Sequence, residues 1–216
     1  MALGISFVNI SNCGCIRDIC NVFKARVLQH LRACYKHERG RVMAGLNGSF
    51  ALPGNLALRF TGADDEPFLF QLLKEARPWL SWAEGNSDFL RVLHEQQFNA
   101  IRTGLGQAYP EHMDLIIEDC GIRVGRLVVS LGYSEWRLSE LQLLTGAQGK
   151  GIGSGVIRSL QTAAARLSLP ITLSTPMFGS HGPHVYHRLG FQVTEVSPPH
   201  YHMQWMPPQV VASMQH

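Results

Sequence analysis

The sequence predicts an α/β domain built on one mixed, mostly antiparallel sheet of six to seven strands, with helices on both faces. Strand-like and helix-like segments alternate in the order β-α-α-β-β-β-α-β-α-β, with room for one further strand near the C-terminus. Three consecutive strands favour antiparallel pairing, whereas a central strand–turn–helix–strand unit favours a parallel pair. The 216 residues, of which 45% are hydrophobic, suffice for one core of this kind.

Each expected element rests on a local pattern. Leu56–Phe60 alternates as a half-buried strand does, and Thr61 is expected to cap the helix that follows, whose first turn is acidic. Cys120-Gly121 predicts a turn, and Gly125 predicts a bulge within its strand. We expect strands at 56–60, 114–119, 123–131, 136–144, 171–174, 191–196 and about 202–206. We expect helices at 61–77, 88–105, 153–167 and 184–189.

The first 50 residues differ from the rest of the chain and are expected to form a basic N-terminal appendage and linker. They hold seven Lys and Arg against two acidic residues, and apolar residues at helical spacing predict an amphipathic helix within 16–35. Met43 is a possible alternative start, so this segment is either a start-site extension, a poorly ordered tail or a tether to a partner. The predicted domain spans 51–208, and 209–216 form a C-terminal tail.

Composition excludes several classes of protein. Residues 51–216 carry 12 basic and 14 acidic residues, which argues against a nucleic-acid partner. No uninterrupted apolar run reaches about 18 residues, so no membrane span is expected. Five cysteines, four of them before residue 35, form no disulfide framework and favour a reducing, cytoplasmic setting. The histidines and cysteines lack a metal-binding spacing, so no metal is expected.

The feature that carries chemistry is a glycine-rich turn between a predicted strand and a predicted helix. It runs from Gln148 to Ser154. Glycine amides can approach a ligand closely, and the unpaired N–H groups of a first helical turn attract an anion. Lys150 adds a positive charge. The turn therefore predicts a phosphate site.

Three phosphate-binding patterns compete for this turn. A P-loop requires Ser or Thr after the lysine, but Gly151 follows Lys150. A dinucleotide fingerprint that starts at Gly149 requires Gly or Ala where Ser154 stands. The third pattern is Gln or Arg, two free positions, Gly, one free position, then Gly or Ala, and it is met by Gln148, Gly151 and Gly153.

With this third pattern the sequence resembles the GNAT superfamily of N-acetyltransferases. Three further segments support the resemblance: Leu141–Leu144 before the turn, Val124–Leu127 as a third-strand start, and Tyr186–Phe191, which matches the family ending Tyr-x-x-Leu-Gly-Phe. The resemblance covers about 56–206. An unrelated α+β fold with a chance glycine turn remains the alternative.

The resemblance implies that acetyl-CoA is the cosubstrate and that two parallel strands, 136–144 and 171–174, splay apart to hold it. Its pantetheine amides would pair with the backbone of Leu143 and Leu144. Its pyrophosphate would lie on the turn, on Gln148, Gly149, Lys150, Gly151, Ile152, Gly153 and Ser154. An amine of a small molecule or peptide would attack the thioester directly in a ternary complex. The oligomeric state, monomer or homodimer, is left open.

Two side chains are candidates for proton transfer. Tyr186 matches the family's tyrosine acid beside the sulfur, and Glu140 stands mid-strand where many relatives place a carboxylate facing the amine. A carboxylate beside apolar neighbours would have a raised pKa, as a base near neutral pH needs. Some relatives use a glutamate on the next strand, and that position is Ser174 here.

One loop departs from the family. Relatives carry an asparagine that contacts CoA where this chain has Gly179, and Ser180 is the expected substitute. This departure keeps a second interpretation open, in which the domain binds acyl-CoA or a partner without catalysis.

Overall fold

The computed structural model describes residues 48–76, 87–108, 112–178 and 182–213. The chain divides into two compact units, Met1–Leu46 and Asn47–His216. The expected basic helix lies in the first unit, outside the described residues. The second unit carries the sheet.

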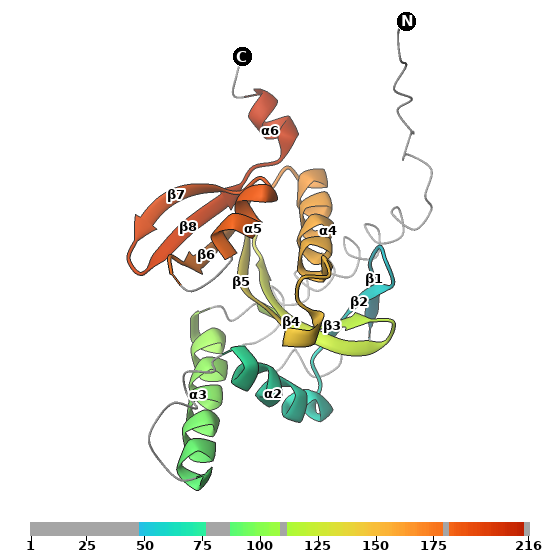
Figure 1. Ribbon diagram of the computed structural model, residues 1–216. Helices are drawn as coiled ribbons and strands as arrows, with labels where there is room; N and C mark the ends of the chain where they lie inside the picture. Colours follow the sequence, from blue (N-terminus) through green and yellow to red (C-terminus); the bar gives the residue numbers. More distant parts are fainter. Residues whose placement is uncertain (1–47, 77–86, 109–111, 179–181, 214–216) are drawn as a thin grey trace, which may run out of the picture. The chain divides into compact units, whose positions relative to one another are not determined.

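The sheet has eight strands in the order β1-β2-β3-β4-β5-β6-β8-β7 (Figure 1). Every neighbouring pair is antiparallel except β5 and β6, which confirms the mixed sheet. The expected number of strands was too low, because Ser49–Ala51 in the expected linker pairs with Leu56–Phe60. The strands are β1 Ser49–Ala51, β2 Leu56–Phe60, β3 His112–Asp119, β4 Ile122–Leu131, β5 Trp136–Leu143, β6 Ile171–Pro176, β7 Gln192–Ser197 and β8 His200–Trp205.

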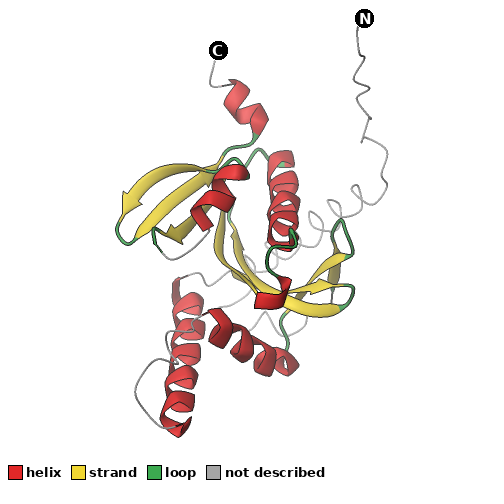
Figure 2. Cartoon of the chain, in the orientation of Figure 1, coloured by secondary structure: helices red, strands yellow, loops and turns green. Residues whose placement is uncertain are grey.

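Helices lie on both faces of the sheet (Figure 2). They are η1 Ala63–Asp65, α2 Glu66–Ala76, α3 Ser87–Ala108, η3 Thr145–Ala147, α4 Ile152–Arg166, α5 Gly182–Arg188 and α6 Pro208–Ser213. The last of these lies in the segment expected to be a tail. Among the described residues, no helix is both long and apolar enough to cross a membrane.

The two faces can be assigned from contacts and register. On one face, Phe68 and Leu72 of α2 form a buried cluster with Ile116 of β3. On the other, Gly153 of α4 lies against the side chains of Leu141 and Leu143. Since side chains alternate along a strand, residues that pair across strands share a face. Burial of both apolar faces is the main source of stability for this sheet.

The start of the first helix differs from the prediction. Gly62, and not Thr61, is the N-cap, and its amide donates to the Asp65 carboxylate at 2.9 Å. Thr61 instead donates its hydroxyl to the Asp114 carbonyl across the sheet. The acidic first turn is as expected, because carboxylates near a helix N-terminus are stabilised by its dipole.

The centre of the sheet opens between β5 and β6. These strands pair only from Trp136↔Ile171 to Leu138↔Leu173, although β5 continues to Leu143. The cause is a bulge in β5: Val128 pairs with Glu140 and Val129 with Leu138, so Ser139 is an extra residue that bends the strand. The structure thus has the strand splay that the resemblance implied.

Candidate functional site

The glycine-rich turn connects the splayed end of β5 to α4. Gly149 and Gly151 have φ of +74° and +81°. Residues other than glycine adopt such a backbone conformation at a cost of about 1–2 kcal/mol. Gly151 is the N-cap of α4, and its carbonyl accepts the helix's first backbone bond, from Gly155 at 2.8 Å. The glycines therefore set the direction in which the helix begins.

The N-terminus of α4 can bind an anion. The amides of Ile152, Gly153 and Ser154 precede the first helical bond and have no carbonyl partner within the helix. A Cβ added to Gly149 or Gly151 would meet no atom within 4 Å, so the turn is open around both. Amides without a helical partner at a helix N-terminus, with an open turn before them, suit a phosphate group.

The open edge of β5 offers backbone groups for an extended ligand. Of the expected pair, Leu143 and Leu144, the second is not available. Leu144 donates its N–H to Val124 and accepts at its carbonyl from Ala147, so neither group is free. Because backbone direction alternates along an antiparallel strand, Leu141 and Leu143 direct their groups away from β4, toward the splay. The Leu143 carbonyl accepts from the Gln148 side chain at 3.0 Å, which ties the turn to the strand.

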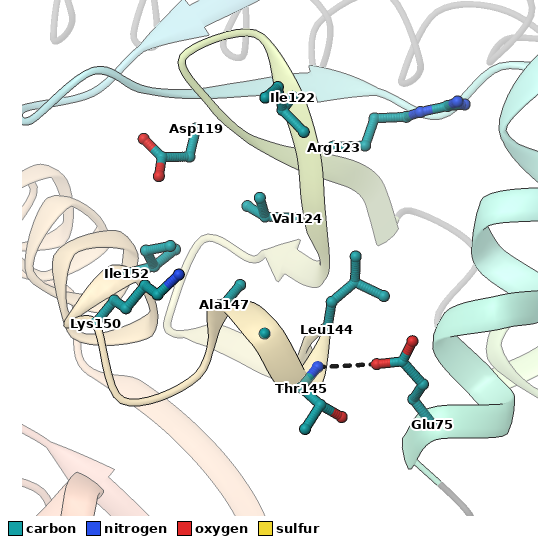
Figure 3. Close-up of a pocket in the computed structure, with 11 residues that line it drawn as sticks. Glu75, Asp119, Ile122, Arg123, Val124, Leu144, Thr145, Ala147, Lys150 and Ile152 are labelled. Carbon is teal, nitrogen blue, oxygen red and sulfur yellow. Dashed lines mark hydrogen bonds between the residues drawn. The ribbon is translucent and has the colours of Figure 1, made fainter.

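A cavity of about 380 Å³ lies on the opposite side of the turn, between it and the β3–β4 hairpin. Thr145, Lys150 and Ile152 line it from the turn, and Arg123 and Val124 line it from β4. Figure 3 shows the Lys150 ammonium directed into this cavity. The lysine of the turn therefore places its charge on the β4 side, while the splay opens on the β6 side.

Glu75 holds Thr145, at the start of the short helix that precedes the turn. The sequence did not predict this contact. The Thr145 amide donates to its carboxylate at 2.8 Å (Figure 3). Gln71 donates to the other carboxylate oxygen at 3.0 Å. The Thr145 bond, followed by that from Gln71, lowers the pKa of Glu75. A lone glutamate on a helix surface carries no sequence signal for a contact 70 residues away.

Tyr186 lies on α5, which packs against β6. Its ring meets that of Phe191 edge-on, with centroids 5.7 Å apart. Burial raises the pKa of its hydroxyl. A phenol that keeps its proton above neutral pH can donate it to a leaving thiolate, so this environment is compatible with the predicted acid.

Glu140 is not the unpaired carboxylate among apolar neighbours that the sequence suggested. Its Oε2 accepts from Arg126 at 2.9 Å, and its Oε1 accepts from Gln142 at 2.6 Å. Arg126 also holds both oxygens of Asp114, at 2.8 and 2.6 Å. Burial lowers the pKa of Arg126, but the Asp114 hydrogen bonds and both carboxylate charges outweigh it and the net pKa is raised.

Arg126 is a second residue that sequence reasoning missed, although it left a signal. It is the sole charged residue between Val124 and Ser130, in an otherwise apolar strand. A buried arginine requires carboxylate partners. Ser180, the expected substitute for the family's asparagine, lies outside the described residues.

Comparison with known proteins identifies the fold. No model of a protein family and no curated protein matches this chain. Among solved structures, the PaiA N-acetyltransferase from Thermoplasma acidophilum in complex with coenzyme A matches with a TM-score of 0.53 and 15% identity, over 70% of this chain and 98% of its own. An acetyltransferase from Thermus thermophilus matches with a TM-score of 0.53 and 16% identity, over 72% and 99%. RimL, a ribosomal L7/L12 α-N-protein acetyltransferase in complex with coenzyme A, matches with a TM-score of 0.52 and 17% identity, over 74% and 98%. The chain therefore has the fold of the GNAT acetyltransferases.

Proposed function

We propose that this protein is an acyl-CoA-dependent N-acyltransferase that transfers an acetyl group from acetyl-CoA to an amine of a small molecule or peptide. The observation that carries the proposal is the splay of β5 from β6 beside a glycine turn that opens a helix. Three solved structures of this fold are acetyltransferases, and two of them are complexes with coenzyme A. The shared fold and the local geometry support the same ligand.

Each part of the site has a role in this proposal. The pyrophosphate binds the amides of Ile152, Gly153 and Ser154, and the pantetheine arm pairs with the backbone of Leu141 and Leu143. The thioester then lies where the strands diverge. An amine attacks the carbonyl carbon, the C–S bond breaks, and Tyr186 gives the departing sulfur a proton. Transfer proceeds in a ternary complex without an acyl-enzyme.

Glu140 is proposed to face the acceptor amine. One arginine and two carboxylates give its cluster a net charge of −1, which attracts an ammonium group. Its predicted role as the base remains a prediction, tested by Glu140→Gln. If Glu140 is the base, this change lowers kcat roughly 10²–10⁴-fold at neutral pH and less at high pH, where the amine is already neutral.

Binding is tested by thermal shift with acetyl-CoA, since a ligand that binds only the folded state raises Tm. Gly153→Ala tests the pattern of the turn, which admits Gly or Ala at this position. Its Cβ would meet Leu143 and Leu141 at 3.5 and 3.7 Å, ordinary contacts, and alanine favours a helix by up to about 1 kcal/mol. We expect Tm without ligand to hold or rise and the acetyl-CoA shift to be retained, whereas Gly151→Ala, at φ of +81°, should lower both.

Gly104→Ala is the matched control for this test. It adds the same methyl group to α3, where nothing lies within 4 Å. We expect the same effect on Tm without ligand and an unchanged acetyl-CoA shift. Absence of any shift for the wild type at saturating acetyl-CoA would overturn the proposal.

Turnover is tested by CoA release across a panel of amines. Tyr186→Phe keeps the ring that packs on Phe191 and removes only the proton donor. We expect kcat to fall while the acetyl-CoA thermal shift is retained. Equal rates for the variant and the wild type would remove Tyr186 from the mechanism.

A non-catalytic acyl-CoA-binding module is the second candidate. One observation favours it: both oxygens of Glu140 accept hydrogen bonds, from Arg126 and Gln142, which favour its charged form and make it a poorer proton acceptor. A thermal shift with acetyl-CoA, combined with no CoA release for any amine in the panel, would select this second candidate.

A further inference from the structure

We propose that His202, acting through the Ser174 hydroxyl, receives the proton that the acceptor ammonium must lose before it attacks. This inference rests on the proposed function. It concerns a part of the site that the glycine turn does not reach. It assigns the base role to a pair of residues on β6 and β8, rather than to Glu140.

The pair is part of a hydrogen-bonded chain across three strands. Arg137 Nη2 on β5 donates to Ser174 Oγ on β6 at 2.6 Å. Ser174 Oγ lies 2.8 Å from Nδ1 of His202 on β8. A guanidinium can only donate, so one lone pair of Ser174 Oγ is filled, and its hydrogen is available for Nδ1. The second lone pair of Ser174 Oγ remains available to a donor on the bound substrate.

This chain of residues lies at the vertex of the splay. Leu138↔Leu173 is the last pair between β5 and β6, and Ser174 is the next residue of β6. The hydroxyl is therefore at the point where the two strands begin to diverge. The thioester is proposed to lie at this same point, so an ammonium approaching it can reach Ser174.

The chain also lies on the same face of the sheet as Glu140. Val128 and Ser130 are two residues apart on β4 and share a face. Their register partners are Glu140 and Arg137. The amine-facing carboxylate and the Arg137–Ser174–His202 chain therefore face the same space, opposite the face covered by α4.

Buried polar atoms next to the vertex are consistent with a polar ligand there. Arg137 Nε, Ser139 Oγ and Ser130 Oγ are buried and have no hydrogen-bond partner in the described part of the chain. Such atoms are uncommon in folded proteins and call for a specific explanation. An acceptor with polar groups beside its amine would supply partners to them.

The proton transfer balances as follows. The ammonium donates a proton to Ser174 Oγ while Ser174 passes its own to Nδ1 of His202, which becomes an imidazolium. The neutral amine forms the C–N bond, and the electron pair of the broken C–S bond goes to sulfur. The acylated nitrogen then loses a second proton. This proton goes to the Tyr186 phenolate and replaces the one that Tyr186 gave to the thiolate. His202 returns its proton to solvent, since it is only partly buried.

Histidine suits this role because its charge changes between about pH 5 and 8. The charged groups that face His202 from neighbouring strands are Arg137 on β5, through Ser174, and Glu195, its register partner on β7. Ser174 and Arg137 fix the imidazole's position, and Glu195 is exposed.

The test compares two nucleophiles that differ in protonation at pH 7. Methylamine is mostly an ammonium ion and needs a base, whereas hydroxylamine is mostly neutral and does not. CoA release is measured with saturating acetyl-CoA for the wild type, His202→Gln, Ser174→Ala and Ser174→Thr. His200→Gln is the matched control, because it changes an exposed histidine two residues away on the same strand. The acetyl-CoA thermal shift reports folding of every variant.

We expect His202→Gln and Ser174→Ala to lower the rate with methylamine roughly 10²–10³-fold and the rate with hydroxylamine less than about threefold. The methylamine deficit should close as pH rises and the amine loses its proton to solvent. Ser174→Thr keeps the hydroxyl and should recover most of the methylamine rate that Ser174→Ala loses, whereas His200→Gln should stay near the wild type.

Three outcomes would count against the inference. An equal loss with both nucleophiles, or a loss independent of pH, would mean that His202 is only structural. No loss in either variant would remove the pair from proton transfer. If the wild type shifts with acetyl-CoA but releases no CoA with either nucleophile or with any amine of the panel, the enzymatic part of the proposed function fails together with this inference.

Discussion

Two arginines in this sheet each bind two carboxylates, but in different surroundings. Arg126 joins Asp114 and Glu140 at the centre, with 6% of its side chain exposed. Arg59 on β2 joins Asp65 of η1 and Glu118 of β3, with 29% of its side chain exposed. The same set of charges therefore occurs once buried beside the proposed acceptor site and once near the surface, at the start of α2.

The difference indicates what each cluster is for. The Arg59 cluster contains the Asp65 carboxylate that caps the helix start. Besides its two bonds from Arg59, this carboxylate accepts one from Arg123 at 3.2 Å. It joins α2 to the sheet. The Arg126 cluster joins only strands that already pair, so its burial adds little to the fold's connectivity. Buried ion pairs often stabilise no more than apolar side chains would, which favours a role for this cluster in the site.

The largest expected effect comes from breaking the buried cluster. Arg126→Ala leaves Asp114 and Glu140, which are 23% and 15% exposed, without a counter-charge, which costs up to about 3–5 kcal/mol. Arg59→Ala should cost less, because Asp65 keeps its bonds from Arg123 and the Gly62 amide. Urea unfolding at pH 7 measures both. An equal cost for the two variants would contradict the distinction between the clusters.

The second prediction concerns the pH dependence of the peripheral cluster. The Arg59 hydrogen bond, opposed by burial and helped by the Gly62 amide and Arg123, lowers the pKa of Asp65 from 3.8 to about 2. Since the folded pKa lies below the unfolded one, the carboxylate stabilises the fold above pH 3.8, by about 2 kcal/mol. This contribution is lost as pH falls from 3.8 through about 2.

Asp65→Asn removes this contribution at neutral pH. We expect its unfolding free energy to be about 2 kcal/mol lower than that of the wild type at pH 7, and the gap to close toward pH 2. Asp64→Asn is the matched control, because Asp64 is the exposed neighbour in the same turn. A gap that stays constant with pH would show that Asp65 acts by packing and not by charge.

The sequence predicted local features well and long-range ones poorly. The glycine turn, the Cys120-Gly121 turn and the strand at Leu56–Phe60 are each encoded by neighbouring residues. Strand β1 was missed because a three-residue strand carries almost no periodic signal. The contact of Ser174 with His202 depends on the register of β6 and β8, which are separated by a helix and a strand. No spacing rule connects two such residues.

Glu140 illustrates the same limit at the site. Its position on the strand was clear from the motif that follows it, but its environment was not. Gln142 lies two residues along β5 and so shares a face with Glu140, but Arg126 comes from β4. The register that brings Arg126 to Glu140 is not encoded in β5 alone, and the sequence of β5 gave no sign of the bulge at Ser139 either.

The smallest expected effect concerns Glu75, a carboxylate outside the two arginine clusters. It binds no arginine among the described residues. It stands in the last turn of α2, where the helix dipole disfavours a negative charge. Its bond to the Thr145 amide offsets that cost and holds the start of the glycine turn. Glu75→Gln should lower the unfolding free energy by less than about 1 kcal/mol and speed hydrogen exchange at Thr145.

Gln71→Ala is the control, because it removes a neighbour of Glu75 and leaves the Thr145 bond in place. If Glu75 positions the turn, Glu75→Gln also reduces the acetyl-CoA thermal shift, whereas Gln71→Ala does not. Equal shifts in the two variants would mean that the turn keeps its geometry without this carboxylate. The glycines at 149 and 151 would then be sufficient to set it, since their left-handed backbone already fixes where α4 begins.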